Sequence, residues 1–196
     1  MDQSLERPAR ATDALDLLLT RQSVGLLEEP APQGAELDLI LEAGLRAPDH
    51  GRLRPWRFVL IRGEARLAWG ERLADAARLR DPVTAAALGE RLRAWVRRTP
   101  LIIAVGAEIR GNHKIPEIEQ ILSVGAAAMN MLNAIHMLGY GGMWVTGANA
   151  YDPRVNAWLG FEPPNRLIGF LAVGTPKMAP RVERPEREQH VREWSG

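Results

Sequence analysis

The chain has 196 residues, of which 46% are hydrophobic and 25% are charged, and it contains no cysteine. This length and composition predict one ordinary globular domain and exclude a disordered chain. The absence of cysteine excludes a disulfide scaffold, an iron–sulfur cluster, thiolate-bound zinc and a cysteine nucleophile. Lys and Arg number 25 against 24 Asp and Glu, so no nucleic-acid partner is expected.

The two ends of the chain differ in composition from its middle. We expect a flexible arm at residues 1–11, a single domain over 12–177, and an extended tail rich in proline and charge over 178–196. The first ten residues lack the apolar stretch of a signal peptide. No run of apolar residues is long enough to predict a membrane helix, so we expect a cytoplasmic protein with no membrane partner.

Hydrophobic periodicity in the first half predicts helices and strands without a regular alternation. In chain order they are a helix over 13–20 capped by Thr12, a helix over 35–46, a strand over 57–61, two arginine-rich helices over 64–79 and 82–98, and a buried strand over 101–105.

In the second half, residues 116–138 predict a helix that is apolar nearly all round, ended by Gly139. Such a helix is buried in the core or between subunits. A strand over 143–146, a short helix over 152–159 begun by Asp152 and Pro153, and a strand over 166–173 follow. Without βαβ alternation, this order favours the α+β class.

No motif predicts a catalytic side chain. The sequence lacks G-x-S-x-G, H-E-x-x-H, a dinucleotide fingerprint and a P-loop. Its four histidines stand singly, which predicts no metal site. What remains are stretches suited to binding a polar, anionic organic ligand.

Three such stretches stand out, and each also has a plain structural explanation. Arg21-Gln22-Ser23 suits a phosphate, although an arginine there also complements a helix dipole. The turn from Arg46 to His50, before Pro55-Trp56, presents donors but also stops a helix. The glycines at 139, 141, 142 and 147 allow close approach of a planar ligand, or simply form a cap and a turn.

Taken together and in order, these stretches resemble the nitroreductase-like flavoprotein family, in particular its short bacterial YdjA-type NAD(P)H nitroreductases. The resemblance spans roughly residues 13–177. It rests on residues 21–23, on 46–50 with 55–56, on 112–116 with 119–120, on 141–144 with 146–147, and on 168–171 with 174–176.

This resemblance implies an α+β sandwich with a central, mostly antiparallel sheet flanked by helices, in an intertwined homodimer. It implies FMN in clefts at the dimer interface and NAD(P)H as co-substrate. By resemblance, Arg21, Gln22 and Ser23 hold the phosphate, Arg46 and His50 contact the flavin, and Trp144, Val145 and Thr146 line the isoalloxazine. The segment for NAD(P)H is Ala134, Ile135, His136, Met137, Leu138 and Gly139.

The sequence departs from the family's usual pattern at two positions where a cationic side chain is common. Gln22 stands where a second arginine is usual, and Val145 replaces the arginine of Trp-Arg-Ser. Arg52 and Arg54 add positive charge after His50. We therefore expect one of these two arginines to replace the lost cation at the pyrimidine edge of the flavin.

The function implied is ping-pong hydride transfer from NAD(P)H, through FMN, to a small acceptor such as a nitroaromatic or a quinone. The alternatives are another flavin redox reaction on the same fold, a non-catalytic flavin-binding or storage protein, and a ligand-free dimeric scaffold. The sequence does not select between NADH and NADPH.

Overall fold

The computed structural model describes residues 9–178 and 182–196 and is built around one antiparallel sheet. Its long central strand, β5 (Arg166–Pro176), pairs with β3 on one side and with β4 on the other, and its last two residues pair with β1. β3 in turn pairs with β2. The other strands are β1 (Leu27–Glu28), β2 (Trp56–Arg62), β3 (Leu101–Ala107) and β4 (Gly141–Val145). The predicted α+β class with an antiparallel sheet is confirmed.

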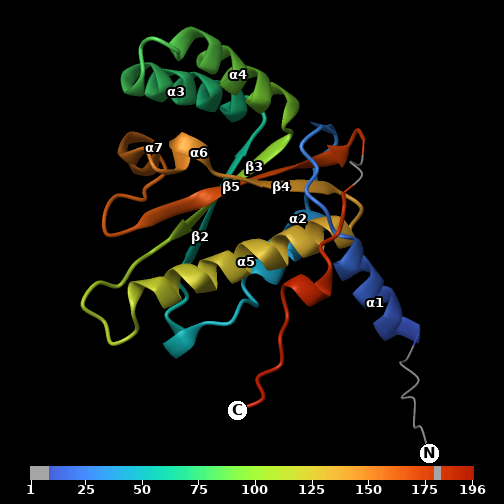
Figure 1. The fold of residues 1–196 in the computed structure, drawn as a ribbon. Coiled ribbons are helices and arrows are strands. Elements are labelled where there is room, and N and C mark those ends of the chain that lie inside the picture. The colour runs from blue at the N-terminus through green and yellow to red at the C-terminus, as the bar shows by residue number, and fades with distance from the viewer. Residues whose placement is uncertain (1–8, 179–181) are drawn as a thin grey trace, which may run out of the picture.

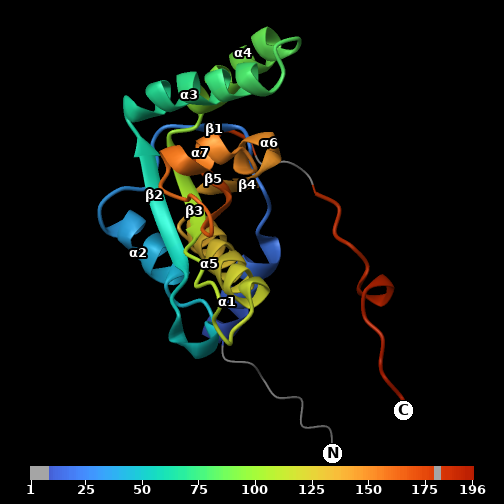
Figure 2. The ribbon, with the colours of Figure 1, turned by 90° about the vertical axis from the view of Figure 1, so that its left-hand side faces the viewer.

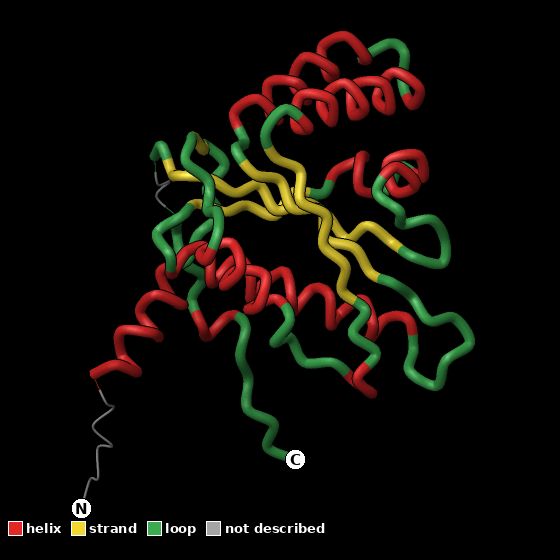
Figure 3. The backbone as a smooth tube through the Cα atoms, turned by 180° about the vertical axis from the view of Figure 1, so that it is seen from behind, coloured by secondary structure: helices red, strands yellow, loops and turns green. Residues whose placement is uncertain are grey.

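Helices cover both faces of this sheet (Figure 1). One face carries α5 (Glu117–Met137) and α2 (Ala35–Gly44); the other carries the hairpin of α3 (Ala65–Arg80) and α4 (Ala85–Arg98), with α6 (Gly147–Ala150) and α7 (Pro153–Trp158). Seen from behind, the strands separate the two helical layers (Figure 3). The first helix, α1 (Ala9–Thr20), projects from the end of α5.

Strand β3 is buried along its whole length, as its continuous apolar run predicts. Because side chains alternate across a strand, Ile103 and Val105 join the core cluster on the α5 side. Ile102 and Ala104 join the cluster on the α3–α4 side. A single strand therefore anchors both layers of the fold.

Two predicted helix ends have the expected geometry. Asp152 caps α7 by accepting a hydrogen bond from the Arg154 amide at 2.9 Å, with Pro153 in the first turn. Gly139 follows α5 with φ 84°, and its amide donates to the His136 carbonyl while the Tyr140 amide donates to that of Ile135. This pair of bonds is the Schellman arrangement.

Other boundaries differ from the sequence expectation. Helix α1 begins at Ala9, so Thr12 lies inside it rather than capping it, and residues 9–11 of the expected arm are helical. The rest of the expected arm lies outside the described residues. Strand β1 and helix α6 were not predicted, because elements of two and four residues leave no periodicity to detect.

Helix α5 keeps an apolar stripe open to solvent in the single chain. Ile118 is 60% exposed and Leu122 is 63% exposed, and Met129 and Met137 continue the same face. Of the two predicted forms of burial, the core of a single chain does not cover this face, and burial between subunits stays a prediction. Helix α1 adds four leucines with large exposed fractions: Leu15, Leu17, Leu18 and Leu19.

The last segment, 182–196, is exposed throughout and stands away from the sheet (Figure 2). Its regular structure is the short 3-10 helix η2 (Arg187–Gln189). Arg184 Nη2 donates a hydrogen bond to the carbonyl of Thr20 at 3.1 Å, where α1 ends. No helix in the described parts of the chain has the length and hydropathy to cross a bilayer.

Candidate functional site

A groove runs between α4 and β4. It consists of a pocket of about 400 Å³ beside the end of β4 and a second pocket of about 240 Å³ that reaches Gly25 and Leu26. The two pockets share Trp95, Arg98 and Met143. We call their union the β4–α4 groove. Its volume is in the range of pockets that bind cofactors and small ligands.

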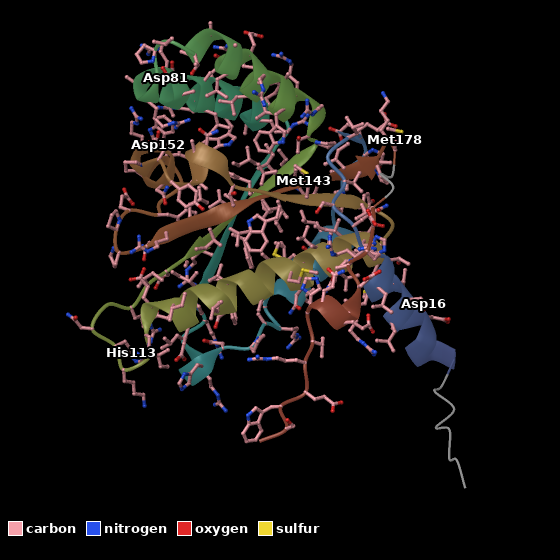
Figure 4. The ribbon with its side chains drawn as sticks, in the orientation of Figure 1. Asp16, Asp81, His113, Met143, Asp152 and Met178 are labelled. Carbon is pink, nitrogen blue, oxygen red and sulfur yellow. The ribbon has the colours of Figure 1, made fainter. Side chains whose placement is uncertain are left out.

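The walls of the groove are largely apolar because two periodic faces meet there. Leu88, Leu92 and Trp95 follow one another on a single face of α4. Opposite them, Met143 and Val145 occupy alternate positions of β4, and Met143 lies between this strand and α4 (Figure 4). The result is an apolar slot between a helix and a strand, suited to a flat ring system.

The charged groups that line the groove are all arginines. Arg80 is already engaged, since it donates to the Asp152 carboxylate at 2.5 Å and to the Asn149 side-chain oxygen at 2.7 Å. Arg91 and Arg98 have no ion-pair partner among the side chains described at 13–178 and 182–196, and none of these side chains that line the two pockets is a carboxylate. The groove therefore favours an electron-rich or anionic ligand.

The loop after α1 is fixed against the edge of the sheet beside this groove. The Val24 amide donates to the Gly142 carbonyl at 3.0 Å, and the Lys177 amide donates to that of Leu26 at 3.0 Å. The preceding side chains, Arg21, Gln22 and Ser23, are half-buried or exposed and make no side-chain hydrogen bond to any described residue. They remain available as donors to an anion.

The glycines of the third stretch divide into two groups. A Cβ on Gly141 would lie 2.7 Å from Leu27 Cδ2, and one on Gly142 would lie 3.0 Å from Leu132 Cδ2. Core packing therefore explains these two glycines. Gly147 differs, since it has φ 67°, lines the groove and has nothing within 4 Å of its Cβ position. Here the backbone is open to a ligand.

Trp144 lies on the other side of the sheet from Val145. It packs with the α5 cluster, and its ring comes 3.9 Å from the Cβ position of Gly125. Its Nε1 is buried without a hydrogen-bond partner in the described residues. Of the three residues expected around a flavin ring, Val145 and Thr146 line the groove, and Trp144 does not.

The turn after α2 lies at the far end of α5. His50 Nδ1 is 2.5 Å from Glu119 Oε2 in the first turn of that helix. The end of α1 meets its last turn, where Thr20 Oγ1 is 3.1 Å from His136 Nε2. Between Glu119 and His136 a helix rises by about 25 Å. One chain therefore does not bring Arg46 and His50 to the groove.

Arg52 and Arg54 share that distant turn. Both are exposed and have left-handed backbones, with φ of 56° and 51°. The Arg54 amide donates to Asp49 Oδ2 at 2.7 Å, which stabilises the turn. Neither arginine lines the groove of its own chain. The expected replacement of the lost cation by one of them therefore requires a second copy of the chain.

The segment expected to accept NAD(P)H, 134–139, is mostly part of the core. Ile135 is fully buried, and Ala134 and Leu138 pack against the same cluster. Met137 and Gly139 are exposed. Within one chain, Ile135 offers no surface to a co-substrate, and Ala134, His136 and Leu138 are only partly exposed.

Sequence reasoning missed the contribution of α4. The signal was present, because Leu88, Leu92 and Trp95 form one apolar face of an otherwise arginine-rich helix. No group of three or more acidic or histidine side chains in the described residues is arranged to hold a metal ion.

Comparison with known proteins gives the family. The sequence pattern of the nitroreductase family matches residues 19–175. The chain belongs to the nitroreductase family. It is 42% identical over 169 residues to "Putative NAD(P)H nitroreductase YdjA" of Escherichia coli (strain K12), a match covering 85% of this chain and 90% of that protein. A relative from Haemophilus influenzae, also named as an NAD(P)H nitroreductase, is 34% identical and covers 91% of this chain and 94% of its own.

Solved structures of the nitroreductase fold agree with this assignment. A nitroreductase-like family protein from Bacillus cereus superposes with a TM-score of 0.81 at 24% identity, covering 93% of this chain and 96% of its own. A protein from Desulfovibrio desulfuricans, solved in complex with FMN, gives a TM-score of 0.71 at 25% identity, covering 93% and 98%. The helical layers and the antiparallel sheet are thus those of the family.

Proposed function

We propose that this nitroreductase-family chain is an FMN-dependent oxidoreductase that passes a hydride from NAD(P)H, through the flavin, to a nitroaromatic, a quinone or a similar acceptor. The observation that carries the proposal is the β4–α4 groove, an apolar slot whose described lining includes arginines and no carboxylate, beside the donors of Arg21, Gln22 and Ser23. The names of the E. coli and H. influenzae relatives support the activity, and the D. desulfuricans complex supports FMN.

In this proposal, the chain holds the two ends of FMN with different chemistry. Arg21 and Ser23 donate to the phosphate, and Gln22 adds neutral hydrogen bonds without charge. Val145 and Thr146 line the ring, where the open backbone at Gly147 allows close approach. When bound, FMN supplies the two-electron chemistry, so the protein needs no nucleophile. The residues of the groove bind, orient and desolvate the ring.

The proposed active form is a homodimer. The exposed stripe of α5, from Ile118 to Met137, and the leucines of α1 are apolar surfaces that a second copy would cover. In one chain, the predicted flavin-binding stretches lie at opposite ends of α5. A second copy would bring them together, because its Arg46 and His50 would then approach the groove of the first copy. In this arrangement each flavin lies at the interface, and NAD(P)H and the acceptor bind there in turn.

Two measurements test this function. Purified protein should carry FMN, or take it up, at one per chain, as measured from its visible absorption and by chromatography of the released chromophore. The loaded protein should then oxidise NADH or NADPH with a nitroaromatic or a quinone present. Bound FMN without turnover would favour a flavin-binding or storage protein, and failure to bind FMN would overturn the proposal.

A further inference from the structure

The β4–α4 groove receives its unpaired positive charge from a helix that none of the flavin-binding stretches includes. Neither Gln22 nor Val145 carries a charge. On the opposite wall, α4 contributes Arg91 and Arg98. Because Arg80 of α3 is paired with Asp152, the unpaired positive charge of the groove lies on α4 and not on β4.

Of these arginines, Arg98 has the most informative position. It lines both pockets, so it lies between the Gly25–Leu26 end of the groove and the Thr146 end. It is exposed, and its side chain has no hydrogen-bond or ion-pair partner among the side chains described at 13–178 and 182–196. Arg80 is bound to Asp152 and Asn149, and Arg91 lines only the pocket beside β4. Arg98 is therefore the free guanidinium at the middle of the groove.

A cation at this position has a definite chemical use if the groove holds FMN. Uptake of a hydride by the flavin leaves negative charge on its pyrimidine ring, and a guanidinium offers both charge and paired donors to that edge. Stabilisation of charge that develops during reaction is a large contribution to catalysis.

Resting on the proposed function, we propose that Arg98 is the cation that faces the pyrimidine ring of the flavin. In this role it makes the reduced flavin easier to form. It is a residue of the same chain that supplies Gly25 and Thr146, so it acts without help from a second copy.

The chain provides a matched control for the test. Arg97 is the neighbouring residue in the last turn of α4, is exposed, and lines neither pocket. Both arginines complement the helix dipole, so replacing either removes the same background effect. Because Arg98 makes no side-chain hydrogen bond or ion pair among the described side chains, Arg98→Gln should remain folded, which circular dichroism checks.

The experiment measures the dissociation constants of FMN and riboflavin, and the two-electron midpoint potential of bound FMN, for the wild type, Arg98→Gln, Arg98→Lys and Arg97→Gln. In Arg98→Gln we expect reduced FMN to bind about tenfold more weakly relative to oxidised FMN, which makes the midpoint potential about 30 mV more negative. FMN and riboflavin should be affected alike. Arg98→Lys should restore most of the potential, and Arg97→Gln should match the wild type.

Each other result has a definite meaning. Weaker binding of FMN with unchanged binding of riboflavin would show that Arg98 contacts the phosphate, and would overturn its role at the ring. An unchanged potential in Arg98→Gln, with wild-type protein that binds FMN, would overturn the role of Arg98 alone. Wild-type protein that binds neither flavin would overturn the proposed function itself.

Discussion

The charge cluster around Asp152 gives the sharpest prediction about stability. The Asp152 side chain has no exposed surface. Oδ1 accepts from the amide of Arg154 at 2.9 Å, and Oδ2 accepts from Arg154 Nη2 at 2.9 Å and from Arg80 Nη1 at 2.5 Å. This carboxylate ties the start of α7 to the end of α3, beside the wall of the β4–α4 groove. The informative change is Asp152→Asn, which keeps the size and the cap acceptor but removes the charge.

The expected loss in the free energy of unfolding of Asp152→Asn follows from the burial of the charged groups. Breaking a buried ion pair by removing one partner commonly costs about 3–5 kcal/mol. Here the side chains of Arg80 and Arg154 are 22% and 36% exposed, so water partly solvates them after the change. We therefore expect the lower end, about 3 kcal/mol. For a chain of this length this lowers Tm by about 6–12 °C.

Urea denaturation followed by circular dichroism, at saturating FMN for every variant, measures this difference. The matched control is Asp75→Asn, whose carboxylate meets Arg78 with both side chains more than half exposed. The control should change stability by less than about 1 kcal/mol. If Asp152→Asn and Asp75→Asn unfold at the same urea concentration, the argument from burial is refuted.

The same cluster predicts a pH dependence with a definite sign. Hydrogen bonds from Arg154, and then from Arg80, hold the pKa of Asp152 far below its usual range, against the opposing effect of desolvation. A lowered folded-state pKa contributes stability above the unfolded pKa of about 3.9, and this contribution is lost as the pH falls towards the folded value. The stability difference between wild type and Asp152→Asn should therefore be constant from pH 7 to 5 and shrink below about pH 4.

Three further predictions concern the site and the interface. Gly169→Ala should lower the free energy of unfolding by about 2 kcal/mol and alter the near-UV circular dichroism of tryptophan. The reason is that the new Cβ would lie 2.3 Å from Trp144 Nε1, at a position where the backbone φ is 153°. An unchanged spectrum and Tm would contradict this packing. Leu122→Glu should convert the proposed dimer to monomers in light scattering and reduce its FMN content, because it places a charge on the exposed stripe of α5; a dimer that persists would exclude that stripe as the interface. Arg21→Gln should weaken FMN binding about tenfold and leave riboflavin binding unchanged; equal losses for both flavins would place Arg21 at the ring.

The sequence alone predicted the family and several local features of the fold. The order of short stretches, from Arg21-Gln22-Ser23 to Gly174-Thr175-Pro176, indicated the nitroreductase family, and the family match over residues 19–175 confirms it. Local patterns also predicted the buried strand β3, the Asp152 cap and the glycine after α5, because each depends on neighbours close in sequence.

Spatial relations between those stretches were not accessible in the same way. The stretch at Arg21 and the turn at His50 both belong to the set of short stretches that indicated the family. In the folded chain they lie at opposite ends of α5. Alternation along β4 places Val145 in the groove and Trp144 against α5. A sequence motif does not predict how far apart in space its parts lie along a helix. It also does not predict the face of the sheet to which each side chain points.

The sequence by itself determined the α+β class, the order of the main helices and strands, and a resemblance to flavin-binding proteins, because these follow from periodicity and from short local motifs. Tertiary structure alone decided that α4 forms a wall of the groove and that Arg98 lies at its middle. The physical reason is that the groove joins segments from Gly25 to Met178, whose approach depends on how α4 packs across the sheet rather than on any residue's near neighbours.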